Sequence, residues 1–528
     1  MKSISVLDCT LRDGGYCNQW KFGKENILEI VTGLVSANVD YIECGFLTNQ
    51  ISYDDNSTQY TDLTQVSHFL SRSTIDKTCL VMINYGEYEI DLLPFARETH
   101  IDGIRVAFHK KDMEGALAFC RAIKDKGYLV FLQPMVSMSY SEKEFISLLR
   151  EVNKLRPHAF YIVDSFGMMK RKELMHFLDL VERNLEKDIV LGFHAHNNMQ
   201  LAYSNAQYLV ESPMVRSLII DVSIHGMGRG AGNLNAELFL GYLNEMVKSN
   251  YSIRPILKLM DEIISRFYEE KPWGYSLPNY LSAIHMIHPN YARYLNEKKT
   301  LTLEAIDDIF SMIDPEKAVQ YDEKYIEKLY IAFLSGGKIR SNHLEEISDR
   351  LKGKKVLLIA PGESALTGRS KIQQFIDENN PVVFSINHNY SYVKTDYIFV
   401  SNMRRFRQLN RTEFYKTITT SNIPTDETYA SVKYEHLLNT VDGVRDNAGL
   451  MAIKFIAGFG IKEFYLAGFD GFSHDVNRDF EARDMVMLHS PEAFDRINKG
   501  MQQVLKMFSK EFRIHFLTES LIMPKDFL

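Results

Sequence analysis

The sequence predicts an α/β protein with a (β/α)8 barrel first, a helical extension next, and a Rossmann-like α/β domain last. Three observations support this prediction. Eight short apolar runs alternate with amphipathic stretches up to residue 224, the strand pattern stops from Pro255 to Ile347, and a second alternation begins at Lys354. A chain of 528 residues is also too long for one hydrophobic core, so two or three domains are expected.

The eight apolar runs have the order and spacing of strands in a TIM barrel. Each crossover between parallel strands must carry a helix, so alternating strands and helices predict a parallel sheet. Eight such units need about 250 residues, and the runs are continuously apolar, as buried parallel strands are. An open doubly wound sheet is the alternative. The runs are Ile4–Leu7, Tyr41–Cys44, Cys79–Ile83, Gly103–Ala107, Leu129–Gln133, Ala159–Val163, Ile189–Phe193 and Leu218–Ile224.

Helices are predicted between these strands and again after them. The amphipathic stretches of the barrel are Glu25–Ala37, Met113–Lys126, Glu142–Leu155 and Lys172–Leu185. Residues 251–348 are predicted to form a helical extension packed on the barrel, which occupies residues 1–250. Its helices are Ile256–Tyr268, Tyr280–Ile287, Leu303–Phe310 and Tyr325–Phe333.

Residues 349–528 are predicted to form a separate Rossmann-like domain. A strand enters the turn Ala360–Ser364 and then a helix, and further apolar runs follow. The expected strands are Val356–Ile359, Val382–Ile386, Tyr397–Val400, Glu463–Leu466 and Ile514–Leu517.

Composition excludes several classes of protein. Hydrophobic residues make up 45% and charged residues 24% of the chain, as in ordinary soluble proteins. The net charge of −7 argues against a nucleic-acid binder, which needs a basic surface. The sequence has no apolar run long enough to cross a membrane, no signal peptide at its N-terminus, and five cysteines without a CxxC pair. We therefore expect a cytoplasmic homo-oligomer with no nucleic-acid partner and no membrane span.

Polar clusters follow three of the predicted barrel strands. Asp8–Gly15 follows the first strand, His194–Asn198 the seventh, and Gly226–Asn233 the eighth. Active sites of TIM barrels lie at the carboxyl ends of the strands, and strands 1, 7 and 8 are neighbours when the barrel closes. Because residues i and i+2 of a strand point the same way, His194 and His196 can face one carboxylate and form a site for a metal.

These clusters match a known family. The segments LDCTLRDGG, GFHAHNN and GMGRGAGNLNAE resemble the DRE-TIM metallolyases, which include 4-hydroxy-2-oxovalerate aldolase, hydroxymethylglutaryl-CoA lyase and the isopropylmalate synthases. The resemblance is greatest to the 4-hydroxy-2-oxovalerate aldolase-like and HMG-CoA lyase-like members, and it covers about residues 4–300. It implies an aldolase or lyase that forms or breaks a carbon–carbon bond next to a 2-oxo acid.

The resemblance also implies the metal ligands. Asp13 of the RDG triplet and the pair His194 and His196 match the family's ligands, and Asn233 matches an asparagine that some members add. The alternative for Asn233 is a turn residue needed only for loop shape. The expected ion is Mn²⁺ or Mg²⁺, with Co²⁺ or Zn²⁺ as further candidates, and it acts as a Lewis acid toward a bound 2-oxo acid.

Three further residues are candidates for catalysis. The match implies that Arg12 stabilises the developing negative oxygen, and a salt bridge that closes the barrel is the alternative. Tyr16 stands where the aldolases have a histidine, so it is either the proton-transfer group or a substrate contact. Tyr275 matches a tyrosine that the aldolases send back into the barrel mouth, and a core aromatic is the alternative.

Other polar residues at strand ends are weaker candidates for substrate binding. Inward-pointing barrel residues often only satisfy one another, and that is the alternative for this group. Its members are Glu43, Arg105, Gln133, Asp164 and Ser165.

The second domain carries its own candidate site. The turn at Gly362 and Ser364 leads into a helix and can direct backbone N–H groups at an anion, although its spacing is not that of a Walker A motif. With Asn387 and Asp470 it predicts a site for a phosphate or sugar ligand at the carboxyl edge of the sheet. The domain weakly resembles Rossmann-like domains of surface-glycan enzymes. A non-catalytic docking or dimerising domain is the alternative.

The function that we predict is a divalent-metal-dependent aldolase acting on a 2-oxo acid, with pyruvate enolate chemistry. Its second substrate is an aldehyde or a sugar-derived compound, which suggests surface-carbohydrate biosynthesis. One alternative is a Claisen-type synthase or lyase that uses an acyl-CoA. The other is a non-catalytic barrel that serves as a scaffold for the C-terminal domain.

Overall fold

The computed structural model describes residues 3–67, 69–70, 77–298, 300–336, 343–473 and 491–524. The chain forms two compact units. The first consists of Met1–Arg293 and Asp314–Tyr321, and the second of Tyr294–Ile313 and Asp322–Leu528, so the predicted helical extension contributes to both units. Within the described ranges, none of the helices combines the length and the apolar character that crossing a membrane requires.

Eight parallel strands close into a barrel in the first unit, as predicted. The strand order is β1-β9-β8-β7-β6-β5-β4-β2, and the pairing of β1 with β2 closes the ring. The two-residue strand β3 (Gln59–Tyr60) pairs with β2 beside the ring. The ring strands are β1 (Ile4–Asp8), β2 (Tyr41–Leu47), β4 (Thr78–Asn84), β5 (Gly103–Phe108), β6 (Leu129–Pro134), β7 (Ala159–Asp164), β8 (Val190–Ala195) and β9 (Leu218–Val222).

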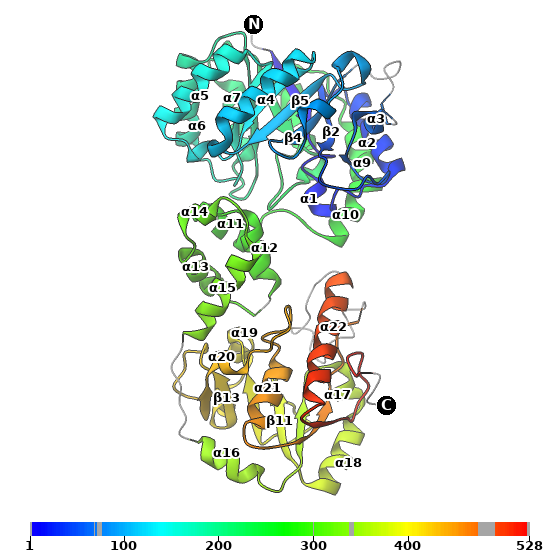
Figure 1. Cartoon of the computed structure of the whole chain (residues 1–528), viewed down its shortest axis with the longest axis vertical. Coiled ribbons are helices and arrows are strands. Elements are labelled where there is room, and N and C mark those ends of the chain that lie inside the picture. Colours follow the sequence, from blue (N-terminus) through cyan, green and yellow to red (C-terminus); the bar gives the residue numbers. More distant parts are fainter. Residues whose placement is uncertain are drawn as a thin grey trace. The chain divides into compact units, whose positions relative to one another are not determined.

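The strands bury both of their faces, which explains their continuous apolar runs. In β7, Phe160 and Ile162 belong to the large core between strands and helices, whereas Tyr161 and Val163 belong to a smaller core. The smaller core also contains Leu7 of β1, so it fills the inside of the barrel. The outer helices surround the strands (Figure 1). They include α2 (Lys24–Ser36), α4 (Met113–Asp125), α5 (Glu142–Leu155), α6 (Arg171–Asn184), α7 (Ala202–Glu211) and α8 (Ala236–Met246).

The chain after α8 stays part of the barrel unit. A continuous helical stretch consists of α9 (Ile253–Leu259), a π-helical segment (Met260–Ile264) and α10 (Ser265–Glu270). Ile256 and Ile264 from this stretch are buried in the core between strands and helices. The Trp273 indole N–H donates to the carbonyl of His225, 2.9 Å away in the loop after β9. The shorter helices α11 (Leu277–Ile284) and α14 (Pro315–Ala318) also belong to this unit, and α12 (Pro289–Glu297) crosses its boundary after Arg293.

The second unit contains a parallel sheet in the order β14-β13-β12-β11-β10-β15-β16. Five of its strands were predicted, and β13 and β14 were not. The strands are β10 (Val356–Ile359), β11 (Val382–Ile386), β12 (Tyr397–Val400), β13 (Thr417–Thr420), β14 (Ala430–Val432), β15 (Glu463–Ala467) and β16 (Arg513–Phe516).

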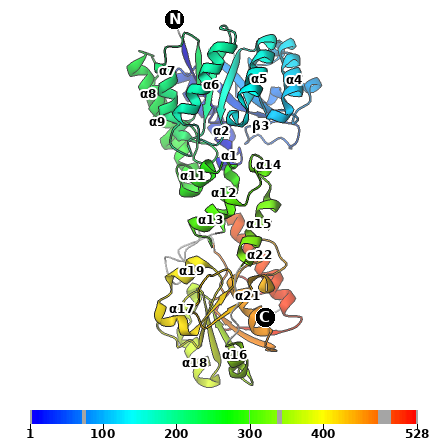
Figure 2. The ribbon, with the colours of Figure 1, turned by 90° about the vertical axis from the view of Figure 1, so that its left-hand side faces the viewer.

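Helices pack on this sheet (Figure 2). Ile372 of α18 lies in one core with Leu357 and Ile359 of β10, while α21 packs on β11 and β12. The helices of this unit are α13 (Leu303–Ser311), α15 (Glu323–Ser335), α16 (Leu344–Leu351), α17 (Glu363–Thr367), α18 (Arg369–Asn379), α19 (Met403–Gln408), α20 (Tyr434–Leu437), α21 (Ala448–Ala457) and α22 (Pro491–Phe508).

Candidate metal centre

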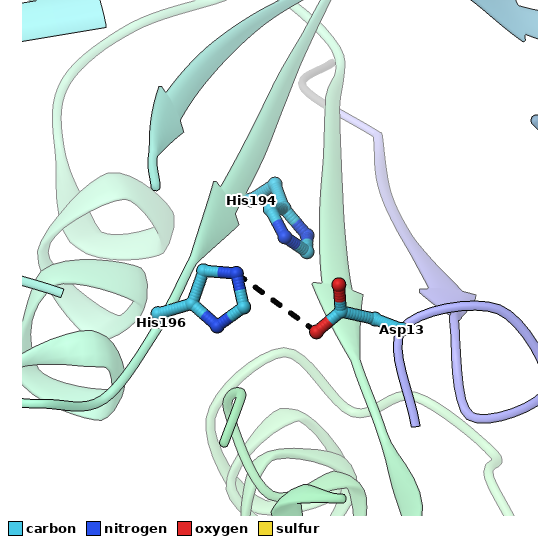
Figure 3. Close-up of side chains that lie close together, drawn as sticks. All are labelled: Asp13, His194 and His196. Carbon is cyan, nitrogen blue, oxygen red and sulfur yellow. Dashed lines mark ion pairs between the residues drawn. The ribbon is translucent and has the colours of Figure 1, made fainter. Parts of the chain in front are cut away.

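Asp13, His194 and His196 converge at the carboxyl ends of β1 and β8, the two barrel strands that flank β9. Asp13 lies in the turn after β1, His194 lies in β8, and His196 follows β8 directly. All three side chains are buried, and one ligand atom from each lies within 4.8 Å of the others. The His196 Nε2 atom is 3.9 Å from the Asp13 Oδ2 atom (Figure 3). The structure therefore brings together the three predicted ligands.

Asn233 joins this group through the glycine-rich loop after β9. Its backbone forms an antiparallel bridge with His196, and its Nδ2 atom donates to the Asp13 Oδ2 atom at 2.8 Å. The Nδ2 atom also donates to the Met227 carbonyl at 3.0 Å, which fixes the amide. The Asn233 Oδ1 atom is buried without a hydrogen-bond partner. A buried oxygen of this kind needs a partner, and a divalent cation is one that fits.

The approach of Asn233 to Asp13 depends on Gly228. A Cβ atom at this position would lie 2.3 Å from the Asn233 Nδ2 atom and 2.7 Å from the Asp13 Oδ2 atom. Any side chain at residue 228 would therefore push the two ligand candidates apart.

The surroundings of the centre keep Asp13 and His196 unprotonated at neutral pH. Burial alone would raise the pKa of Asp13, but the charges of Arg12, His196 and His194 hold it well below its usual value. Burial lowers the pKa of His196 to about 3. A metal ion binds carboxylates and neutral imidazoles, so both groups are in their metal-binding form at neutral pH.

A buried chain of charges supports the centre from inside the barrel. The Arg12 guanidinium donates to Asp13 at 2.5 Å and to Glu43 at 2.9 Å. Arg105 donates to the same Glu43 oxygen at 2.7 Å and also to Asp221.

Asp221 connects this chain of charges to a metal-ligand candidate. Its Oδ2 atom lies 2.9 Å from the Nδ1 atom of His194. Asp221 thereby fixes the His194 ring and leaves its other nitrogen for the centre. Asp221 was not among the residues predicted from the sequence, although an aspartate within the apolar run Leu218–Ile224 is a visible signal.

The other predicted substrate-binding residues bond to the protein itself. Arg105 and Glu43 are fully buried. When the Gln133 amide is oriented to satisfy its hydrogen bonds, its oxygen accepts from the Arg105 guanidinium. Asp164 accepts the backbone N–H groups of Met168 and Met169 at 3.0 Å. The Ser165 hydroxyl accepts the N–H of Val136 at 2.9 Å. These contacts match the alternative in which inward-pointing residues satisfy one another, and substrate binding by them stays a prediction.

The structure places the two candidate tyrosines differently. Tyr16 is partly buried in the mouth of the barrel, where its ring packs on Trp20 and Phe46 at centroid distances of 4.7 and 6.5 Å. Burial raises its pKa above the usual value. Tyr275 lies before α11 with 51% of its surface exposed, so it is not gathered with the buried ligands.

Two further groups at the mouth were not singled out from the sequence. The Arg229 backbone N–H donates to Asp13 at 3.4 Å, and its guanidinium lies 3.2 Å from the His288 Nε2 atom. Arg229 lies inside the polar cluster Gly226–Asn233 that follows the eighth predicted strand. No sequence signal connects His288, which is 59 residues further along the chain, with this loop.

In the second unit, the predicted anion-binding turn already holds a carboxylate. Asp470 accepts the backbone N–H of Ser364 at 2.7 Å and also the Ser364 hydroxyl. Gly362 allows this approach, since a Cβ atom there would lie 2.4 Å from the Asp470 carboxyl carbon. The negative charge of Asp470 argues against a phosphate at this turn. Asn387 follows β11, the strand next to β10, and its buried Oδ1 atom is unpaired.

A cavity of about 210 Å³ lies elsewhere in the second unit. It opens between the helices α13 and α15 and the carboxyl ends of β12 and β13. None of the four predicted ligand-binding residues lines it. The lining includes Asp308, Tyr330, Asn402, Arg407, Asn422 and Asp446.

Comparison with known proteins identifies the barrel. The family model described as HMGL-like matches residues 3–263, a range that contains the whole strand ring and all four metal-ligand candidates. Residues 3–263 are an HMGL-like domain. The predicted DRE-TIM family is thereby confirmed for this part of the chain.

The relatives of this HMGL-like domain include aldolases. The 4-hydroxy-2-oxovalerate aldolase of Shewanella halifaxensis is 24% identical over 277 residues, which are 51% of this chain and 79% of that enzyme. The corresponding aldolase of Albidiferax ferrireducens is 28% identical and covers 46% of this chain and 71% of the enzyme. The carboxyl transferase domain of Rhizobium etli pyruvate carboxylase has a TM-score of 0.50 at 14% identity. The match covers 67% of this chain and 66% of the carboxyl transferase chain. This likeness concerns the fold alone.

Proposed function

We propose that this protein is a divalent-metal-dependent aldolase that forms or cleaves a carbon–carbon bond next to a 2-oxo acid. The convergence of Asp13, His194 and His196 beside the unpaired oxygen of Asn233 carries this proposal. Relatives named 4-hydroxy-2-oxovalerate aldolase support it.

The four candidate ligands fit a divalent cation. Two imidazoles, one carboxylate and one amide oxygen form a mixed N/O donor set, which suits Mn²⁺, Mg²⁺, Co²⁺ or Zn²⁺. Bound by these residues, the ion supplies the Lewis acidity that stabilises negative charge on the 2-oxo group. The bond from Asp221 orients His194 for this task.

The remaining residues assist the bond-breaking step. In the cleavage direction, a base removes the proton of the 4-hydroxyl group and the C3–C4 bond breaks. The C4 fragment leaves as an aldehyde, and the electron pair remains on C3 of the pyruvate enolate, which then takes up one proton. We propose that Arg12, fixed by Asp13 and Glu43, stabilises the developing negative oxygen. Because the pKa of Tyr16 is raised, its phenol keeps its proton. We therefore propose that it donates a hydrogen bond to the substrate and does not act as the base.

Exchange of the pyruvate methyl protons for deuterium tests this function without knowledge of the aldehyde. We expect the full-length protein with Mn²⁺ to catalyse the exchange in D₂O, followed by NMR. A chelator should abolish the exchange, and Asp13→Asn should reduce it strongly, because the ligand set loses its carboxylate. Asp179→Asn is the matched control, since Asp179 lies on α6 in an exposed ion pair with Arg183.

The exchange experiment can contradict the proposal directly. Exchange that is absent from the wild-type protein, or that persists in Asp13→Asn and with chelator, would refute a metal-dependent aldolase. A role in surface-carbohydrate synthesis stays a prediction.

A further inference from the structure

Arg229 occupies the mouth of the barrel beside the candidate metal centre. Its backbone N–H donates to the Asp13 Oδ2 atom at 3.4 Å, and its side chain passes over the Tyr16 ring with the guanidinium carbon 5.3 Å from the ring centroid. The guanidinium then reaches the Nε2 atom of His288 at 3.2 Å. The side chain therefore starts next to a metal-ligand candidate and ends at the segment between α11 and α12.

This arginine differs from the two other arginines of the centre in its partners. Arg12 and Arg105 each contact two buried carboxylates. In the described part of the chain, no carboxylate side chain lies within 4.0 Å of the Arg229 guanidinium nitrogens, and the buried Nε atom has no hydrogen-bond partner. The Arg229 side chain is partly buried, and a guanidinium that gives up part of its hydration without gaining an anionic partner is costly.

The groups around Arg229 do not neutralise it. The Nε2 atom of His288 lies 3.2 Å from the Arg229 guanidinium, and its Nδ1 atom lies 3.2 Å from the backbone nitrogen of Asn290. A neutral imidazole accepts a hydrogen bond at only one of its two nitrogens, and in either tautomer it supplies no negative charge. The Tyr16 ring offers only its π face. The charge of Arg229 acts on Asp13, but a bound metal ion would share that carboxylate.

We propose that Arg229 forms the binding subsite for an anionic group on the second substrate, at the mouth of the barrel. This inference rests on the proposed aldolase function and narrows its substrate class. The acceptor is an aldehyde with a carboxylate or a phosphate, whose oxygens take the fork of the guanidinium. His288 and the Tyr16 ring hold the guanidinium in place for this contact.

The subsite concerns the aldehyde and not the 2-oxo acid, so two reactions separate the roles. Pyruvate methyl exchange requires only the 2-oxo acid and the metal, whereas aldol addition requires both substrates. The full-length protein with Mn²⁺ is assayed for both reactions. The aldehydes are propanal as the neutral probe, succinic semialdehyde as the carboxylate and glyceraldehyde 3-phosphate as the phosphate.

We expect the wild-type protein to prefer one or both anionic aldehydes over propanal. Arg229→Gln should lower kcat/KM for the anionic aldehydes by about 10- to 150-fold, the range for a lost hydrogen bond to a charged group. Propanal addition and pyruvate exchange should fall much less than the additions of the anionic aldehydes, and retained exchange also shows that the variant is folded. Arg229→Lys should recover part of the loss, because the charge returns without the fork. Arg183→Gln, on the exposed surface of α6, is the matched control.

The outcomes separate the two proposals. Absence of pyruvate exchange in the wild-type protein contradicts the aldolase function itself. If exchange is normal, equal use of propanal and both anionic aldehydes overturns the subsite. A parallel loss of exchange and of all additions in Arg229→Gln also overturns it, because Arg229 would then serve the 2-oxo acid or the fold. The carboxylate and phosphate arms tell which anion the subsite takes.

Discussion

At the scale of single residues, the candidate metal centre depends on atoms left without partners and on close backbone approaches. The Asn233 amide is held by Asp13 and Met227 so that its oxygen stays unpaired. That orientation exists only because Gly228 has no side chain.

Gly228→Ala should reduce metal affinity strongly. The new methyl group would overlap the Asn233 Nδ2 atom at 2.3 Å and the Asp13 Oδ2 atom at 2.7 Å, so both ligand candidates must move. Loss of a support of the ligands typically costs 10- to 100-fold in metal affinity. Titration of Mn²⁺ into the metal-free protein by calorimetry measures the change. Gly241→Ala in α8 is the control, because a Cβ atom there meets nothing within 4 Å. Equal affinities for both variants would show that the loop has no part in the centre.

His288 should make stability depend on pH. Burial and the charge of Arg229 lower its pKa to about 2, below the value of about 6.5 in the unfolded chain. As pH falls, the unfolded chain therefore protonates His288 before the folded chain does. The contribution of His288 to the free energy of unfolding is lost as pH falls below about 6.5. Between pH 7.5 and 5.5 this loss is about 1.4 kcal/mol. Urea unfolding measures the free energy of unfolding of the metal-free wild type and of His288→Gln at both pH values. Acidification should lower the stability of the wild type by that amount more than the stability of the variant. An identical pH dependence would contradict a buried neutral His288.

At the scale of elements, charged residues inside the barrel connect strands that are far apart in the sequence. Glu43 of β2 contacts Arg105 of β5, and Arg105 contacts Asp221 of β9. All three side chains are buried, so each charge is stabilised by its charged partner and not by water. Asp221, the last member of this series of buried charges, also orients His194. The charges inside the barrel are therefore connected directly to the metal-ligand candidates.

Asp221→Ala should destabilise the protein by about 3–5 kcal/mol, because Arg105 would keep a buried charge with fewer partners. The double variant Asp221→Ala with Arg105→Met should recover part of this loss, since it removes the stranded charge. Denaturant unfolding measures both values. Asp179→Ala, which removes an exposed ion pair, should change stability by less than about 1 kcal/mol. A double variant less stable than the single one would contradict this account.

Element periodicity explains how much of the fold the sequence predicted. Continuous apolar runs identified every strand of the barrel ring, and the polar residues after them identified Asp13, His194 and His196. β13 was missed because its sequence Thr417–Thr420 looks polar, although Thr417, Thr419 and Thr420 are fully buried. Asp221 was missed because the pattern of a strand does not tell which buried acid will face a ligand. The division of the chain at residues 251 and 349 stays a prediction.

At the scale of the whole chain, the barrel unit extends well past its last strand. The α9 helix packs on α2 and α8, and Ile256, Leu259 and Ile263 are buried in the core between strands and helices. The chain returns to the unit at Asp314–Tyr321, where the Tyr291 hydroxyl donates to the carbonyl of Lys317 at 3.0 Å. A barrel that ends with α8 would expose the apolar surface that α9 and the π-helical segment cover.

A chain truncated after residue 250 should therefore fail to fold, whereas a chain truncated after Tyr321 should keep the barrel. Each fully buried isoleucine or leucine contributes about 1.5–3 kcal/mol, so losing Ile256, Leu259, Ile263 and Ile264 removes about 6–12 kcal/mol. This loss is comparable to the whole stability of a typical domain, about 5–15 kcal/mol. Circular dichroism and thermal melting of both truncated chains check the prediction, with Mn²⁺ affinity as a second measurement on the longer one. A cooperative melt of the shorter chain near that of the longer one would show that α9 only decorates the barrel.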